Sequence, residues 1–102
     1  MNRIKALSLA ELSDGSMKTV RVGGKVLTIA RIGQEIYAID DACSHAECSL
    51  GSEGFVDELT VMCGCHGSRF DLVTGKVLSL PATEDVKSYR TEIEGGDVWI
   101  IL

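Results

Sequence analysis

The side chains best suited to bind a transition metal are gathered in one short stretch of this 102-residue chain. Its four cysteines and two histidines all lie between Cys43 and His66. The cysteines of a disulfide scaffold would be spread along the chain, because each bridge has to stabilise a different part of it. Thiolates suit zinc and iron–sulfur clusters, and neutral imidazoles suit zinc, copper and iron. The clustering therefore predicts a metal site.

The six residues occur in two short segments, and each segment mixes both ligand types. The segments are Cys43-Ser44-His45-Ala46-Glu47-Cys48 and Cys63-Gly64-Cys65-His66-Gly67-Ser68, with seventeen residues between His45 and Cys63. Two thiolates and two imidazoles fit either a tetrahedral zinc ion or a two-iron cluster with two cysteines on one iron and two histidines on the other. Structural zinc sites usually pair like ligands at short spacing. The mixed pairs favour the [2Fe–2S] centre.

Glycine turns between apolar stretches predict the strands that would position these segments. The chain has eleven glycines and one proline. Four hairpins are expected, centred on Gly23-Gly24, Gly33-Gln34, Thr74-Gly75 and Gly95-Gly96. The flanking strands are expected at residues 20–22, 26–32, 35–40, 68–72, 76–78, 86–94 and 97–102. Short strands at this spacing, with little helical periodicity, predict an all-β fold, an antiparallel sandwich or barrel.

Two parts of the chain depart from the strand pattern. Ser8–Leu12 has the pattern of a single helical turn. Asp41–Glu58 is rich in serine, cysteine, glutamate and glycine without sustained alternation, so we expect a long loop there, followed by a short strand around Leu59–Met62. A long loop in a small domain is usually functional. No repeat or linker divides the chain, and residues 1–102 are expected to form one domain.

The charge and apolar pattern of the chain argue against two classes of partner. Ten basic and fifteen acidic residues give a formal net charge of -5, which would not attract nucleic acid phosphates or an anionic membrane. The longest apolar run, Val98–Leu102, is far too short to span a bilayer. Polar residues such as Ser8 and Glu11 interrupt the apolar region that a signal peptide would need. We therefore expect a cytoplasmic, soluble protein with no nucleic acid or membrane partner.

The ligand spacing and its surroundings resemble those of Rieske [2Fe–2S] domains, in particular a free-standing Rieske-type ferredoxin. The motif is Cys43-x-His45, seventeen residues, then Cys63-x-x-His66. The matching flanks are Tyr37-Ala38-Ile39-Asp40, Gly67-Ser68-Arg69-Phe70-Asp71, Thr74-Gly75-Lys76-Val77 and Pro81. The resemblance covers the chain from Ile4 to Ile101. It implies an antiparallel β-sandwich or barrel with a two-loop cluster-binding subdomain at one end, at residues 41–82 or close to them.

The resemblance implies a role for each of the four ligand residues. Cys43 and Cys63 would hold one iron, which would be buried. His45 and His66 would hold the other iron near the surface, where the imidazole edges offer an exit for the electron.

The other two cysteines have two possible states. Cys48 and Cys65 occupy the positions at which cytochrome bc-type Rieske proteins have a disulfide between the two cluster loops, and the resemblance favours that bridge. The alternative is two free buried thiols, because cysteine is common in protein cores and cytosolic disulfides are unusual.

Four further residues would surround the cluster. Leu50, Phe70 and Pro81 are candidates for an apolar cover that limits solvent. In high-potential respiratory relatives a serine and a tyrosine hydroxyl at positions 68 and 70 donate hydrogen bonds to sulfur. This chain keeps Ser68 and has Phe70 in place of the tyrosine. We therefore expect a midpoint potential below that of the respiratory type.

The function that the resemblance implies is one-electron transport by a [2Fe–2S] cluster, without catalysis by the chain itself. The partners would be a flavin-containing reductase and a terminal oxygenase, typically an aromatic-ring dioxygenase, and the carrier would be a monomer. One alternative is a small Rieske subunit of a respiratory or metalloid-oxidising complex. A second alternative, of a different class, is a structural zinc-binding module.

The acidic residues near the cluster loops have two interpretations. Glu47, Glu53, Asp57 and Glu58 would guide docking against basic partner surfaces, or they would only keep a small protein soluble. Arg69 is expected either to pair with one of these carboxylates or to take part in docking.

Overall fold

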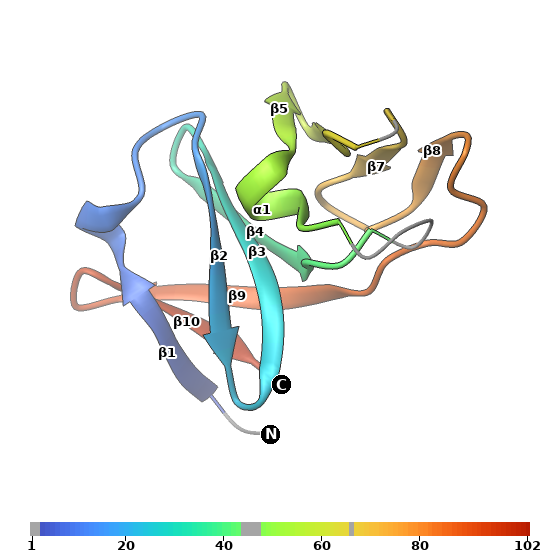
Figure 1. Ribbon diagram of the computed structural model, residues 1–102. Coiled ribbons are helices and arrows are strands. Elements are labelled where there is room, and N and C mark those ends of the chain that lie inside the picture. Colours follow the sequence, from blue (N-terminus) through green and yellow to red (C-terminus); the bar gives the residue numbers. More distant parts are fainter. Residues whose placement is uncertain (1–2, 44–47, 66) are drawn as a thin grey trace.

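The computed structural model of the protein describes residues 3–43, 48–65 and 67–102. The described residues form two antiparallel sheets, one larger and one smaller (Figure 1). The six-stranded sheet has the order β1-β10-β9-β4-β3-β2, and its strands are β1 (Arg3–Ser8), β2 (Met17–Val22), β3 (Lys25–Ile32), β4 (Glu35–Asp40), β9 (Ser88–Glu94) and β10 (Asp97–Ile101). The four-stranded sheet has the order β5-β6-β7-β8, and its strands are β5 (Phe55–Asp57), β6 (Thr60–Met62), β7 (Arg69–Asp71) and β8 (Val77–Ser79).

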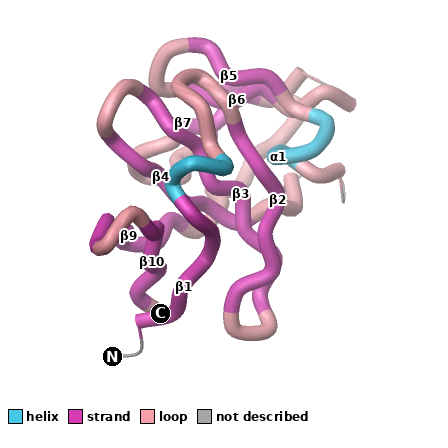
Figure 2. The backbone as a smooth tube through the Cα atoms, turned by 90° about the vertical axis from the view of Figure 1, so that its left-hand side faces the viewer, coloured by secondary structure: helices cyan, strands magenta, loops and turns pink. Residues whose placement is uncertain are grey.

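Strands dominate the backbone in both views, and the four-stranded sheet lies at one end of the six-stranded sheet (Figures 1 and 2). The helical parts of the described residues are a 3-10 turn, Leu9–Glu11, and the four-residue helix α1 (Leu50–Glu53). Both are far shorter than a membrane span. The predicted all-β architecture with a smaller subdomain is confirmed.

The predicted hairpins are confirmed at all four glycine turns. The turn between β2 and β3 places Gly23 at φ 57° and Gly24 at φ 81°, the left-handed region that favours glycine. In the turn between β7 and β8, Gly75 has a φ of 79°, and a side chain there would collide with the carbonyl oxygen of Val86. That glycine therefore lets the turn pack against the chain that enters β9.

Four short elements differ from the sequence-based expectation. The strand β1 was not predicted, although Arg3, Lys5 and their neighbours alternate between polar and apolar, because a single short alternation is a weak signal. The predicted turn at Ser8–Leu12 is a 3-10 helix rather than an α-helix. The predicted loop Asp41–Glu58 contains α1 and β5, which are too short to leave a periodic pattern.

Two groups of buried side chains form the core. The first lies inside the six-stranded sheet, and its buried members are Leu7, Leu12, Val22, Leu27, Ile29, Ile36, Ala38, Val98 and Ile100. The second joins that sheet to the four-stranded sheet, and its members are Ala30, Ile39, Cys43, Cys48, Leu50, Val61, Cys63, Phe70, Leu72, Ala82 and Val86. Three cysteines therefore lie in the core that connects the two sheets.

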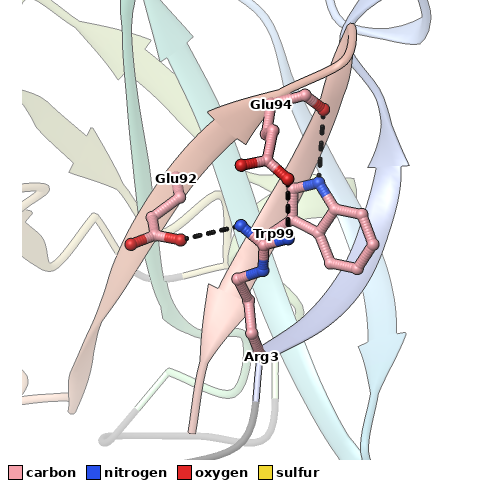
Figure 3. Close-up of polar contacts among 4 residues, drawn as sticks. All are labelled: Arg3, Glu92, Glu94 and Trp99. Atoms are coloured by element: carbon pink, nitrogen blue, oxygen red, sulfur yellow. Dashed lines mark hydrogen bonds and ion pairs between the residues drawn. The ribbon is translucent and has the colours of Figure 1, made fainter.

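A polar cluster joins the N-terminal strand to the C-terminal hairpin (Figure 3). The Arg3 guanidinium forms ion pairs with Glu92 at 3.1 Å and Glu94 at 2.9 Å, and it lies 4.4 Å from the centre of the Trp99 ring. The Trp99 indole N–H donates to the Glu94 carbonyl at 3.3 Å. A single exposed ion pair contributes little to the free energy of unfolding. The main effect of the cluster is therefore to fix the position of β1 beside β10.

Candidate metal centre

The two cysteines predicted to bind iron lie shortly after the ends of two different strands. Cys43 follows β4 and Cys63 follows β6, and both are free thiols that are almost completely buried. Both belong to the core group that joins the two sheets. The predicted imidazole ligands, His45 and His66, lie outside the described residues.

Each of these cysteines opens a loop that is closed in the same way. The backbone N–H of Cys43 donates to the carbonyl of Cys48 at 2.9 Å, and the backbone N–H of Cys63 donates to the carbonyl of Ser68 at 2.7 Å. In both loops the bond spans five residues along the chain. The second loop is tightened further by Gly67, whose N–H donates to the Cys63 carbonyl at 2.9 Å. Two matched loops therefore carry the two thiols at their bases.

A disulfide between Cys48 and Cys65 joins the two loops, with Cα atoms 6.4 Å apart. The predicted bridge is confirmed, and the alternative of two free thiols at these positions is wrong. The sulfur of Cys63 lies within 4.8 Å of both bridge sulfurs. Because bridged sulfurs are not thiolates, they cannot serve as ligands. Cys43 and Cys63 remain as the cysteine donors in the described residues.

The Glu53 side chain lies against this disulfide. Its Oε2 atom is 2.8 Å from the sulfur of Cys48 and 3.6 Å from that of Cys65. Since bridged sulfurs carry no hydrogen, these are S···O contacts and not hydrogen bonds from sulfur. The backbone of Gly64 also packs on the Glu53 carbonyl so closely that a side chain on Gly64 would collide with it. The sequence suggested Glu53 as a docking residue. In the structure it also packs against the disulfide and the second loop.

Two of the three predicted cover residues lie in the same core group as the buried thiols. Leu50 and Phe70 have no solvent-exposed surface and lie in the same core group as Cys43 and Cys63. Pro81 is half-buried and follows a cis peptide bond. The apolar surroundings exclude water from the sulfur side of the site, which lowers the local dielectric constant.

Asp41 fixes the chain that leads into the first loop, a role that was not predicted from the sequence. Its buried carboxylate accepts hydrogen bonds from Thr28 at 2.8 Å, Thr19 at 2.9 Å and the N–H of Gly51 at 3.0 Å. Burial alone would raise the pKa of Asp41, but hydrogen bonds from Ser49 and from these three donors hold the pKa below its usual value. The carboxylate thus links β2, β3 and α1 two residues before Cys43.

Ser68, whose carbonyl accepts from the N–H of Cys63, is fully buried, and its Oγ accepts a hydrogen bond from the N–H of Ala82 at 2.9 Å. Its own hydrogen remains available to donate.

Arg69 forms an ion pair with Asp57 at 3.4 Å, so the expectation of a carboxylate partner for Arg69 is confirmed.

The donor set fits a thiolate-bound iron–sulfur group. Two thiols are buried on separate loops, and apolar side chains shield them. A structural disulfide holds the loops together without using either thiol. Such an arrangement would hold a cluster between the two loops.

Comparison with known proteins gives a family model described as the Rieske [2Fe-2S] domain, which matches residues 2–90. The 3-phenylpropionate/cinnamic acid dioxygenase ferredoxin subunit of Escherichia coli (strain K12) is 42% identical over 103 residues, covering 100% of this chain and 95% of the relative. The subunit of the same name from Shigella flexneri serotype 5b (strain 8401) has the same identity and coverage.

Solved structures with the same fold are also similar over almost the whole chain. The ferredoxin of carbazole 1,9a-dioxygenase from Nocardioides aromaticivorans IC177 has a TM-score of 0.92 at 29% identity, covering 98% of this chain and 97% of that one. A complex of reduced oxygenase and oxidized ferredoxin in carbazole 1,9a-dioxygenase has a chain with a TM-score of 0.87 at 32% identity, covering 96% of this chain and 91% of that one.

Proposed function

Because this chain belongs to the Rieske [2Fe–2S] domain family, we propose that it passes single electrons from a flavin-containing reductase to a terminal oxygenase, an aromatic-ring dioxygenase. It is then an electron-transfer component and not itself an enzyme. The observation that carries the proposal is the pair of buried free thiols, Cys43 and Cys63, on two loops joined by a disulfide. A [2Fe–2S] cluster, when bound, takes up and releases one electron at a time.

Four side chains would hold the cluster in this proposal. Cys43 and Cys63 would bind one iron, and His45 and His66 would bind the other. The apolar residues around the thiols would keep water from the sulfur side of the site, and Ser68 would donate a hydrogen bond to sulfur. The cluster-binding part would correspond to residues 41–82, which contain both loops and the four-stranded sheet.

An apolar face around Leu78 and Leu80, in the cluster-binding part of the chain, supports docking of a partner close to the second loop. Five of the seven exposed large hydrophobic side chains among the described residues belong to this part of the chain: Phe55, Leu59, Val73, Leu78 and Leu80. Leu78 and Leu80 border a groove of about 330 Å³ that also includes Ala82, the hydrogen-bond partner of Ser68. Exposed apolar patches of this kind often mark interaction sites.

The relatives favour the dioxygenase function over the two alternatives. A small subunit of a respiratory or metalloid-oxidising complex would share the disulfide, but the full-length relatives are named as dioxygenase ferredoxin subunits. A zinc module would not explain similarity along the whole chain. The proposal includes a monomer, because a carrier must present the same tip to two partners in turn. It also includes a cytoplasmic location.

The identity of the metal group is tested by electron paramagnetic resonance of the purified protein before and after reduction by dithionite. We expect a signal only after reduction, with an average g value below that of all-cysteine [2Fe–2S] proteins. A silent sample with one zinc per chain, obtained again after anaerobic purification with iron supplied, would contradict the proposal.

The docking face is tested separately by the rate of electron transfer to the oxygenase of a 3-phenylpropionate dioxygenase system. Leu78→Asp places a charge on the apolar face, so we expect slower transfer at an unchanged midpoint potential. Ile93→Asp is the matched control, because Ile93 is similarly exposed, 46% against 49%, but lies on β9. Equal slowing in both variants would contradict this docking face.

A further inference from the structure

A second cavity lies on the six-stranded sheet, away from the predicted ligands in sequence. It has a volume of about 250 Å³ and lies between Lys25 at the start of β3, residues 87–90 at the start of β9, and residues 101–102 at the end of β10. The register of the sheet pairs Arg90 with Ile101. The side chain of Leu102 packs on the turn at Gly23, which places Lys25 beside the end of the chain.

The floor of this cavity is held in place by contacts to β4. The hydroxyl of Tyr89 donates to the carboxylate of Asp40 at 2.7 Å, and the N–H of Asp40 donates to the carbonyl of Lys87 at 2.9 Å. The Lys87 ammonium lies 5.2 Å from the centre of the Tyr89 ring. The tyrosine and the cation above it therefore have fixed positions on the strand.

The charge around the cavity is opposite to that of the chain. The side chains that line it include three cations, Lys25, Lys87 and Arg90, and no aspartate or glutamate, although the chain has a net charge of -5. None of the four ion pairs formed within the part of the chain that the structure describes uses one of these cations. Asp40, the nearby acid, is engaged by the Tyr89 hydroxyl.

The geometry points to this cavity as a binding site for a small organic monocarboxylate with an apolar body. The apolar part would lie against Tyr89, Ile101 and Leu102, and the carboxylate would face the cations at the rim. The volume is slightly below the range of about 300–1,000 Å³ typical of drug-sized ligands, which limits the ligand to a smaller molecule. The site uses no residue of the predicted metal centre. Ligand binding there can therefore be tested independently of the proposed electron transport.

Binding is tested with hexanoate added to the oxidised, cluster-containing protein, followed by the amide resonances of Ser88, Arg90 and Ile101. We expect saturable shifts, and a loss of affinity of about tenfold in the double variant Lys87→Gln/Arg90→Gln, because each substitution removes a cation that would face the carboxylate. Lys18→Gln is the matched control, since Lys18 is an exposed cation of β2 outside the cavity.

Two further ligands separate the parts of the proposed recognition. Hexanamide has the apolar body without the charge, and inorganic phosphate has charge without the apolar body, so both are expected to bind at least about tenfold more weakly than hexanoate. Equal binding of either compound would overturn the proposal. The absence of saturable shifts with hexanoate, or an equal loss in Lys18→Gln and the double variant, would overturn it as well.

Discussion

Ser68 and Ala82 are joined by a buried hydrogen bond in which the serine Oγ accepts from the alanine N–H at 2.9 Å. The bond connects the second loop to the residue that follows Pro81. Because the hydroxyl acts here as an acceptor, its hydrogen can still be donated, in our proposal to sulfur. Ser68 thus has a structural role and, in our proposal, a separate role in setting the midpoint potential.

Ser68→Ala should affect both roles. The midpoint potential is expected to fall by about 60 mV, because a hydrogen bond to a charged group contributes about 1.5 kcal/mol and a one-electron couple shifts by about 59 mV per tenfold change. The protein is also expected to lose about 1–3 kcal/mol of stability, since the N–H of Ala82 loses its partner. A redox titration and thermal unfolding measure the two effects.

Ser79→Ala is the matched control for this variant. The hydroxyl of Ser79 likewise accepts a hydrogen bond from a backbone N–H, that of Arg69 at 3.0 Å, but Ser79 lies on β8 outside the two loops. We expect some loss of stability with no change in potential. An equal shift of potential in both variants would show that the effect of Ser68 does not come from a bond to sulfur.

Phe70→Tyr should raise the midpoint potential by several tens of millivolts. Phe70 is fully buried in the core group that contains Cys43 and Cys63, so an added hydroxyl must find a buried acceptor, and sulfur would provide one. The redox titration is compared with that of Phe55→Tyr, in which the hydroxyl is added to a 60% exposed ring on β5. An unmoved potential in Phe70→Tyr would contradict our explanation of the position.

The hairpins could be predicted from the sequence because their signals are local. A pair such as Gly23-Gly24 has the positive φ angles that the turn requires, and the flanking strands are long enough to show a pattern. Helix α1 and strand β5 have four and three residues. Elements of this length depend on tertiary contacts, such as the hydrogen bond from the Gly51 N–H to Asp41, which no local pattern reveals.

The predicted metal centre shows the same division. Residue type and clustering predicted a metal site among the four cysteines and two histidines, and the family resemblance distinguished the ligands Cys43 and Cys63 from the bridging pair, Cys48 and Cys65. The positions of Asp41 and Glu53 were not predictable, because their partners are distant in sequence or depend on how the loops pack. The second cavity was not predicted for the same reason, since Lys25 is far along the chain from Lys87 and Arg90.

Asp41→Asn should destabilise the protein strongly. The carboxylate accepts from Thr19, Thr28 and the N–H of Gly51, and the oxygen of a neutral amide would accept these hydrogen bonds more weakly. A loss of about 3 kcal/mol is expected for a buried network of this kind, which lowers the unfolding temperature by about 10 °C or more. Asp57→Asn, at an exposed acid, should change the unfolding temperature little, and equal effects would contradict the assigned role.

The pKa of Glu94 gives a prediction about pH. The hydrogen bond from Arg3 lowers the pKa of Glu94 below its ordinary value of 4.5. A lowered pKa means that the ion pair stabilises the fold above pH 4.5 and that this contribution is lost as the pH falls through the lowered pKa.

A carbon-13 titration of the Glu94 carboxyl measures the effect directly. In Arg3→Gln the pKa should return toward its ordinary value. Lys5→Gln is the control, because Lys5 pairs with Asp97 at 3.4 Å and not with Glu94. If the pKa of Glu94 were the same in the wild type and in Arg3→Gln, the hydrogen bond in Figure 3 would not form in solution.

Removal of the disulfide should weaken the hold of the loops on the metal group. The bridge joins residues 17 apart, and closing a loop of about 15 residues stabilises a protein by about 3 kcal/mol in the chain-entropy account. The double variant Cys48→Ala/Cys65→Ala should therefore unfold at a lower temperature and release iron to a chelator faster.

A bound cluster would itself join the two loops, so the change in unfolding temperature should be smaller while the cluster is bound than after it has been removed. Wild-type protein treated with a dithiol reductant should behave as the variant does, and unchanged iron release in both samples would show that the bridge does not hold the loops together.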